Sequence, residues 1–120
     1  MNKKILICDD SLAEMKLMQS VLQQAGYWPV GLSDSKQIEQ TIEAERPQLI
    51  LLDVVMPDRN GFQVCRDLKG NAEFSRIPVI IVSSKSLDSD KFWAQQQGAD
   101  GYVIKPFTAV QLLDAVKKFV

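Results

Sequence analysis

Five short apolar runs divide the chain and predict the strands of a sheet. They occupy residues 5–8, 28–32, 49–52, 79–82 and 102–104. Most of them are continuous rather than alternating, and all are too short for helices, so they are typical of strands that are buried on both faces. The segments between them carry apolar residues at helical spacing.

The segment after the first run predicts a helix with defined ends. Ser11 and Glu14 form the S-x-x-E pattern of a capping box at its start, and Gly26 follows its last turn. Its apolar stripe consists of Leu12, Met15, Met18, Leu22 and Ala25. Because Met15 and Met18 lie on this stripe, we expect them in the core and not at a soft-metal site.

The last segment repeats this pattern, and three weaker helices are predicted between the two. Thr108 and Gln111 form a second capping box, and Lys117 and Lys118 suit the C-terminal end of a helix. The apolar stripe there is Leu112, Leu113, Val116 and Phe119. The middle helices are expected over residues 35–45, 61–70 and 88–97, with Ile38, Ile42, Phe62, Cys65 and Leu68 facing inward.

The alternation of strands and helices predicts an α/β fold. Parallel strands joined by right-handed crossovers place helices on both faces of one sheet, which makes three layers. The 120 residues suit one domain, and no linker or repeat interrupts them.

The amino-acid composition excludes several classes of function. The chain has no histidine, which excludes Ser-His-Asp and Cys-His catalysis and imidazole metal ligands. The 14 basic and 15 acidic side chains nearly balance, and basic runs are no longer than pairs, so nucleic-acid binding is not expected. Cys8 and Cys65 lie in apolar stretches and are expected as buried thiols, in keeping with a cytoplasmic protein. The N-terminus is too polar for a signal peptide or a membrane span.

Polar residues follow four of the five predicted strands. Asp9 and Asp10 follow the first, Asp53 the third, Ser83 the fourth and Lys105 the fifth. In open parallel sheets, functional groups collect at this carboxyl edge. Neighbouring carboxylates there repel by roughly 4 kcal/mol per pair at short range, so the cluster requires a cation. Oxygen-only ligands favour Mg²⁺.

These groups suit phosphoryl transfer onto a carboxylate, which needs a nucleophile, a metal, a cation and a hydroxyl donor. Asp53 follows the most apolar run and precedes Val54, so it is the expected nucleophile at the floor of the site. Asp9 and Asp10, at a strand end joined directly to a helix, are the expected metal ligands.

The sequence resembles the response-regulator receiver domains (CheY-like) of two-component signalling over essentially its whole length. The motifs that carry the resemblance are ILICDD at residues 5–10, LLDVVMP at 51–57 with Gly61 following, PVIIVS at 78–83 and YVIKPF at 102–107. The stretch from Ser83 through Trp93 to Ala99 further resembles receivers of twitching-motility and phototaxis pilus systems.

The resemblance implies a flavodoxin-like strand order 2-1-3-4-5 with five helices, and a role for each site residue. Asp53 would accept the phosphoryl group, and Asp9, Asp10, Asp53 and the backbone carbonyl of Val55 would bind Mg²⁺. Lys105 and Ser83 would contact the phosphoryl group. Tyr102 would be the switch aromatic that follows the movement of Ser83, and the peptide bond between Lys105 and Pro106 would be cis.

Two other functions compete with such a switch. An aspartyl-phosphate hydrolase or phosphotransferase acting on external substrates would use the same carboxylates. It would usually need a second acid or base and a cap, and neither follows Asp53. A flavodoxin-like cofactor binder would need a phosphate-binding loop where Asp9 and Asp10 stand. We therefore expect a switch and not an enzyme.

The expected partners follow from the resemblance to receiver domains. The resemblance implies that a histidine kinase supplies the phosphoryl group. The phosphohistidine would belong to another protein, because this chain has no histidine. A downstream protein would bind the face built from the fourth helix, fifth strand and fifth helix. The resemblance to receivers of pilus systems implies control of pilus motility or taxis. We expect one receiver domain over residues 1–120 with no output domain, no membrane contact, and a monomer or weak dimer.

Overall fold

The computed structural model describes residues 3–120 and contains one sheet of five parallel strands in the order β2-β1-β3-β4-β5. This is the predicted order. The strands are β1 (Lys4–Cys8), β2 (Trp28–Leu32), β3 (Leu49–Leu52), β4 (Val79–Ser83) and β5 (Gly101–Ile104). Each apolar run of the sequence forms a strand, with a one-residue extension in β1, β4 and β5.

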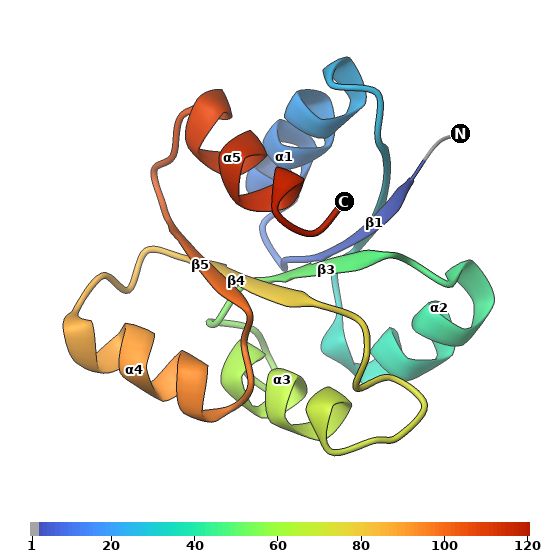
Figure 1. The fold of residues 1–120 in the computed structure, drawn as a ribbon, viewed down its shortest axis with the longest axis vertical. Coiled ribbons are helices and arrows are strands. Elements are labelled where there is room, and N and C mark those ends of the chain that lie inside the picture. The colour runs from blue at the N-terminus through green and yellow to red at the C-terminus, as the bar shows by residue number, and fades with distance from the viewer. Residues whose placement is uncertain (1–2) are drawn as a thin grey trace.

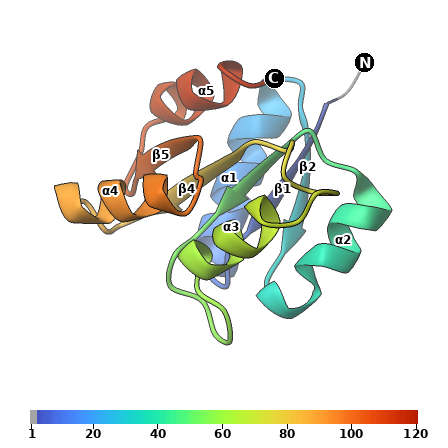
Figure 2. The same ribbon diagram turned by 60° about the horizontal axis from the view of Figure 1, so that its bottom comes forward.

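Helices cover both faces of the sheet. They are α1 (Leu12–Gln24), α2 (Ile38–Glu45), α3 (Gly61–Lys69), α4 (Asp88–Gln96) and α5 (Ala109–Lys117), with a short 3₁₀ turn, η1 (Ser35–Gln37), before α2. α1 and α5 lie on one face, and α2, α3 and α4 lie on the other (Figures 1 and 2). No helix within residues 3–120 is long and apolar enough to cross a membrane.

The alternation of side chains along the strands fills two separate cores. In β1, Ile5 and Ile7 pack with residues of α1 and α5, whereas Leu6 and Cys8 pack with residues of α2, α3 and α4. All four side chains are fully buried. Burial on both faces explains why the strand sequences are continuous apolar runs.

Three details of the predicted pattern are wrong. β2 is an edge strand and is only partly buried, with Trp28 53% exposed, because β1 is its only neighbouring strand within residues 3–120. Leu12 and Ala25 lie at the ends of α1 and are exposed, so the buried stripe is limited to the three residues between them. The segment 35–45 begins as a 3₁₀ turn and becomes α-helical at Ile38.

The capping box of α5 is confirmed, but that of α1 is only half formed. Thr108 and Gln111 exchange both capping hydrogen bonds. At α1, the hydroxyl of Ser11 accepts from the N–H of Glu14 at 3.3 Å, as predicted. The Glu14 carboxylate instead binds the ammonium of Lys105, and the N–H of Ser11 donates to Asp9. Hydrogen bonds between charged groups are the stronger ones, so the side chain follows the ammonium.

Gly61 is required where α3 starts against the end of β3. A Cβ at this position would lie 2.1 Å from the carbonyl oxygen of Asp53, far inside contact distance. The N–H of Gly61 also donates to the carbonyl of Val54 at 2.9 Å. The first residue of α3 therefore packs directly against the backbone of Asp53.

We predict that Gly61→Ala destabilises the fold by about 2 kcal/mol, because the backbone must move to admit the methyl group. Urea unfolding measures the change. Gly70→Ala is the matched control, since its Cβ would meet its nearest neighbour, the carbonyl oxygen of Arg66, at 3.3 Å. Equal losses of unfolding free energy in the two variants would contradict the close packing at Gly61.

Candidate functional site

Backbone hydrogen bonds continue past the ends of the strands and hold the predicted site residues in register. Cys8 of β1 is level with Leu52 of β3, so Asp9 and Asp53 are level with each other at the next position. The N–H of Asp53 donates to the carbonyl of Cys8 at 3.0 Å, and the N–H of Lys105 donates to the carbonyl of Ser83 at 2.9 Å. The predicted edge of the sheet therefore collects residues that are far apart in sequence.

Three carboxylates meet at this edge. Asp9, Asp10 and Asp53 each offer an oxygen that lies within 4.8 Å of the others. Asp9 is fully buried, Asp53 is 9% exposed and Asp10 is exposed, so the cluster opens to solvent on the side of Asp10. The carboxylates of Asp9 and Asp53 each accept one backbone N–H at 2.9 Å, from Ser11 and Val54 respectively.

Lys105 is the cation of the site. Its Nζ lies 2.8 Å from Asp9 Oδ2 and 3.6 Å from Asp53 Oδ1, and it also contacts Glu14. Burial by itself would lower the pKa of Lys105, but hydrogen bonds to Asp9 and Glu14 and the charge of Asp53 outweigh it and raise this pKa. The ammonium therefore stays charged among the carboxylates.

The pKa of the Asp53 carboxyl group is shifted from its usual value. Burial raises its pKa from 3.8 to about 6, although Lys105 and the N–H of Val54 act in the opposite direction, and the nearby charges of Asp9 and Glu14 raise it further. A partly desolvated carboxylate that follows a buried strand is suited to act as a nucleophile.

Ser83 and Tyr102 lie on neighbouring strands and share a contact with Lys85. Ser83 is 1% exposed, and its hydroxyl oxygen accepts from the N–H of Lys85 at 3.2 Å. The hydroxyl of Tyr102 donates to the carbonyl of Lys85 at 2.6 Å. The peptide bond between Lys105 and Pro106 is cis, as the resemblance implies.

The loop between Asp53 and α3 is tied to the start of α2 by contacts that the sequence does not reveal. The buried hydroxyl of Ser35 donates to the carbonyls of Pro57 and Arg59 at 3.2 and 3.1 Å. The Arg59 guanidinium donates to both carboxylate oxygens of Glu39, to Asp67 and to the carbonyl of Ser35. These contacts restrain the loop that carries Val55, whose side chain is 62% exposed.

Glu14 and Arg59 are the two site residues that we did not predict. Glu14 matches a capping-box pattern, so the sequence predicted a helix cap and not a contact with Lys105. Arg59 has no motif around it; only the folded chain brings it to Glu39, 20 residues away.

The two cysteines play no part in this chemistry. Burial raises the pKa of Cys8 to about 12 and that of Cys65 to about 11, so both thiols are neutral near pH 7. The Sγ of Cys8 lies 3.5 Å from the sulfur of Met56. The expectation of buried thiols is confirmed.

The carboxylate cluster fits a small hard cation. Its donors are oxygen atoms from three aspartates, one of which is exposed, so a bound ion could keep several waters. This is the kind of site that Mg²⁺ prefers over an all-protein cage. Lys105 offsets part of the negative charge but leaves the cluster acidic.

The chain belongs to the family of response regulator receiver domains, whose family model matches residues 5–117. Receiver domains accept phosphoryl groups in two-component phosphorelays, and this is the class of protein that the fold and site define.

Among curated proteins, the chain is similar to PilH of Pseudomonas aeruginosa. The two are 39% identical over 94% of this chain and 93% of PilH. Three further relatives, all 30–35% identical, are described as transcriptional regulators, and this chain spans 42–48% of their length.

Solved structures support the same fold. The chemotaxis protein CheY4 of Vibrio cholerae aligns over all of both chains with a TM-score of 0.92 and 24% identity. The receiver domain of the sensor histidine kinase PA1611 of Pseudomonas aeruginosa has a TM-score of 0.89 and 24% identity over 99% of this chain and 98% of its own. That structure has a magnesium ion coordinated in its active-site cleft.

The raised pKa of Asp53 predicts that replacing it by asparagine stabilises the fold near neutral pH. The protonated carboxyl is favoured in the folded state, so its contribution to stability is present below about pH 4 and is lost as the pH rises through about 6. Near pH 7.5 in EDTA, we expect the free energy of unfolding of Asp53→Asn to be about 1–3 kcal/mol higher than that of the parent. The difference should shrink toward pH 4.

Urea unfolding across this pH range measures the effect. Asp114→Asn, which neutralises an exposed carboxylate on α5, is the control for net charge and should show no such trend. A constant difference between Asp53→Asn and the parent at all pH values would contradict the raised pKa.

Proposed function

We propose that this chain is a phosphorylation switch that accepts a phosphoryl group on Asp53. The observation that carries the proposal is the position of the Asp53 carboxylate: nearly buried, within 4.8 Å of Asp9 and Asp10, and 3.6 Å from the Lys105 ammonium. Asp9, Asp10, Asp53 and the backbone carbonyl of Val55 hold Mg²⁺ in this proposal. Ser83 and Lys105 contact the phosphoryl oxygens.

The phosphoryl donor is a phosphohistidine of a histidine kinase, as for other receiver domains. That group lies on a partner protein, because this chain has no histidine. An oxygen of the Asp53 carboxylate attacks the phosphorus as the bond from phosphorus to the imidazole nitrogen breaks. The nitrogen then takes a proton from solvent, and Asp53 becomes an acyl phosphate. Bound Mg²⁺ supplies charge compensation for the transferred oxygens. Lys105 supports this step by placing a fixed positive charge beside the accepting carboxylate.

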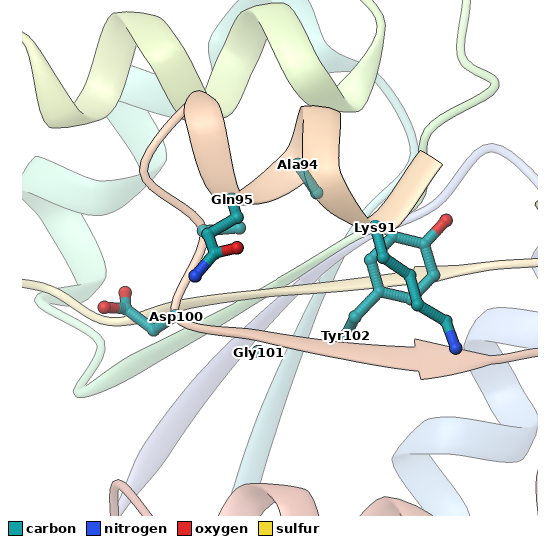
Figure 3. Close-up of a pocket in the computed structure, with 7 residues that line it drawn as sticks. Lys91, Ala94, Gln95, Asp100, Gly101 and Tyr102 are labelled. Carbon is teal, nitrogen blue, oxygen red and sulfur yellow. The ribbon is translucent and has the colours of Figure 1, made fainter. Parts of the chain in front are cut away.

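The output of the switch is a protein contact on the face of α4, β5 and α5. A groove along α4 and β5 is lined by residues that include Lys91, Gln95 and Tyr102 (Figure 3). Because the hydroxyl of Tyr102 binds the carbonyl of Lys85, two residues beyond Ser83, a movement of Ser83 toward a phosphoryl group is transmitted to this groove.

Two aromatic side chains of α4 add to this proposed output surface. Phe92 is 59% exposed and Trp93 is 52% exposed. Exposed aromatic residues are common anchors of protein interfaces. Together with the similarity to PilH, this surface supports a role in a motility or taxis pathway.

Phosphorylation of Asp53 is tested by labelling with a small phosphodonor. We predict that the parent protein with Mg²⁺ gives a shifted band on a phosphate-affinity gel and that Asp53→Asn gives none. Asp58→Asn is the matched control, since Asp58 lies in the same loop and is exposed, and it should still be labelled. Label on Asp53→Asn would contradict the proposal, as would an unlabelled parent beside a labelled control receiver.

The side chain of Val55 predicts a long-lived phosphoryl group. It is exposed beside the site, but an aliphatic group cannot orient water toward the acyl phosphate. We expect Val55→Asn to lose phosphate faster than the parent, on the order of tenfold, well below the effect of a full general base. Release of inorganic phosphate after removal of the donor measures this rate. Val110→Asn, an exposed position on α5, is the control; a rate in Val55→Asn no faster than in the parent would refute the idea.

A further inference from the structure

Lys105 has a second ionic partner outside the predicted site. Its ammonium contacts the carboxylates of Asp9 and Glu14, and both contacts are within hydrogen-bond distance. The third carboxylate, that of Asp53, lies farther off at 3.6 Å. Two of the three ammonium donors are therefore occupied before any phosphoryl group arrives.

Glu14 differs from the other two carboxylates in burial and in place. The side chain of Asp9 is fully buried, whereas that of Glu14 is 47% exposed. Glu14 also lies outside the group of three aspartates whose oxygens are mutually within 4.8 Å among the described residues. Within residues 3–120, the carboxylate of Glu14 forms a hydrogen bond only with Lys105.

The two contacts of Lys105 therefore have different strengths. The pair with Asp9 is enclosed, and breaking it would leave a buried carboxylate without its cation. The pair with Glu14 opens to water, where an ion pair contributes about 0.2–1 kcal/mol and the free carboxylate is well hydrated. Glu14 is thus the partner that Lys105 can exchange at small cost.

We propose that Glu14 is a positioning residue that holds the Lys105 ammonium in the unphosphorylated state and releases it to the phosphoryl group. This inference rests on the proposed phosphorylation of Asp53. In the free protein, Glu14 and Asp9 hold the ammonium 3.6 Å from the Asp53 carboxylate. When Asp53 is phosphorylated, a phosphoryl oxygen replaces the Glu14 carboxylate as the ligand of the ammonium, while Asp9 retains its contact.

The need for this exchange slows the phosphorylation of Asp53. The incoming group is anionic and must compete with Glu14 for the ammonium, and Glu14 adds a further negative charge close to the acceptor. Removing the Glu14 charge should therefore speed phosphoryl transfer. The fold should be retained, because Lys105 keeps its buried partner Asp9.

The test compares Glu14→Gln with the parent and with Glu43→Gln. Glu43 is an exposed glutamate on α2, so its substitution makes the same change in net charge away from the site. With phosphoramidate and saturating Mg²⁺, we expect Glu14→Gln to be phosphorylated about threefold faster than the parent, the ratio that a weak exposed ion pair allows. Glu43→Gln should match the parent.

A second measurement reports the exchange itself. Carbon-13 NMR of glutamate side-chain carboxylates is recorded before and after addition of Mg²⁺ and beryllofluoride, a phosphoryl mimic. The Glu14 signal, assigned by its absence in Glu14→Gln, should move toward the position of the exposed Glu43 carboxylate as it loses Lys105.

Either of two results would overturn the proposal: equal or slower phosphorylation of Glu14→Gln, or a Glu14 signal that stays in place when beryllofluoride binds. These failures differ from a failure of the proposed function. In that case Asp53 of the parent protein would not be labelled at all.

Discussion

The buried ammonium of Lys105 lies 2.8 Å from Asp9 and joins residues that are 96 positions apart in the chain. This ion pair connects the end of β1 with the loop after β5, and it gives the fully buried side chain of Asp9 a cationic partner. Without the ammonium, Asp9 and Asp53 would repel each other in a place that water barely reaches. Both the stability of this edge and its chemistry therefore depend on one cation.

The sheet makes that ion pair possible by aligning the ends of its central strands. The N–H of Asp53 binds the carbonyl of Cys8, and the N–H of Lys105 binds that of Ser83, so the ladder continues one residue beyond the strands themselves. Gly61 allows α3 to begin against the backbone of Asp53, and Ser35 with Arg59 restrains the intervening loop. The Asp53 carboxylate is thus held by elements of the fold on each side.

The sequence predicts the parts of the site that depend on strand order and misses those that depend on packing between helices and loops. Asp9, Asp53 and Lys105 could be predicted because a polar residue after a buried strand falls on the shared edge wherever the strands are parallel. Glu14 could not, because its partner is 91 residues away and its local pattern favoured a helix cap. The same limit applies to β2: an edge position is a property of the sheet, and its apolar run resembles the central ones.

In the proposed mechanism Asp53, and no other carboxylate of the cluster, accepts the phosphoryl group. Borohydride reduces an aspartyl phosphate to homoserine, so peptide mass spectrometry of the reduced, phosphorylated protein locates the modified residue directly. We expect homoserine at position 53 and unmodified aspartate at positions 9 and 10. Homoserine at either of those two positions, or at a residue outside the cluster, would contradict it.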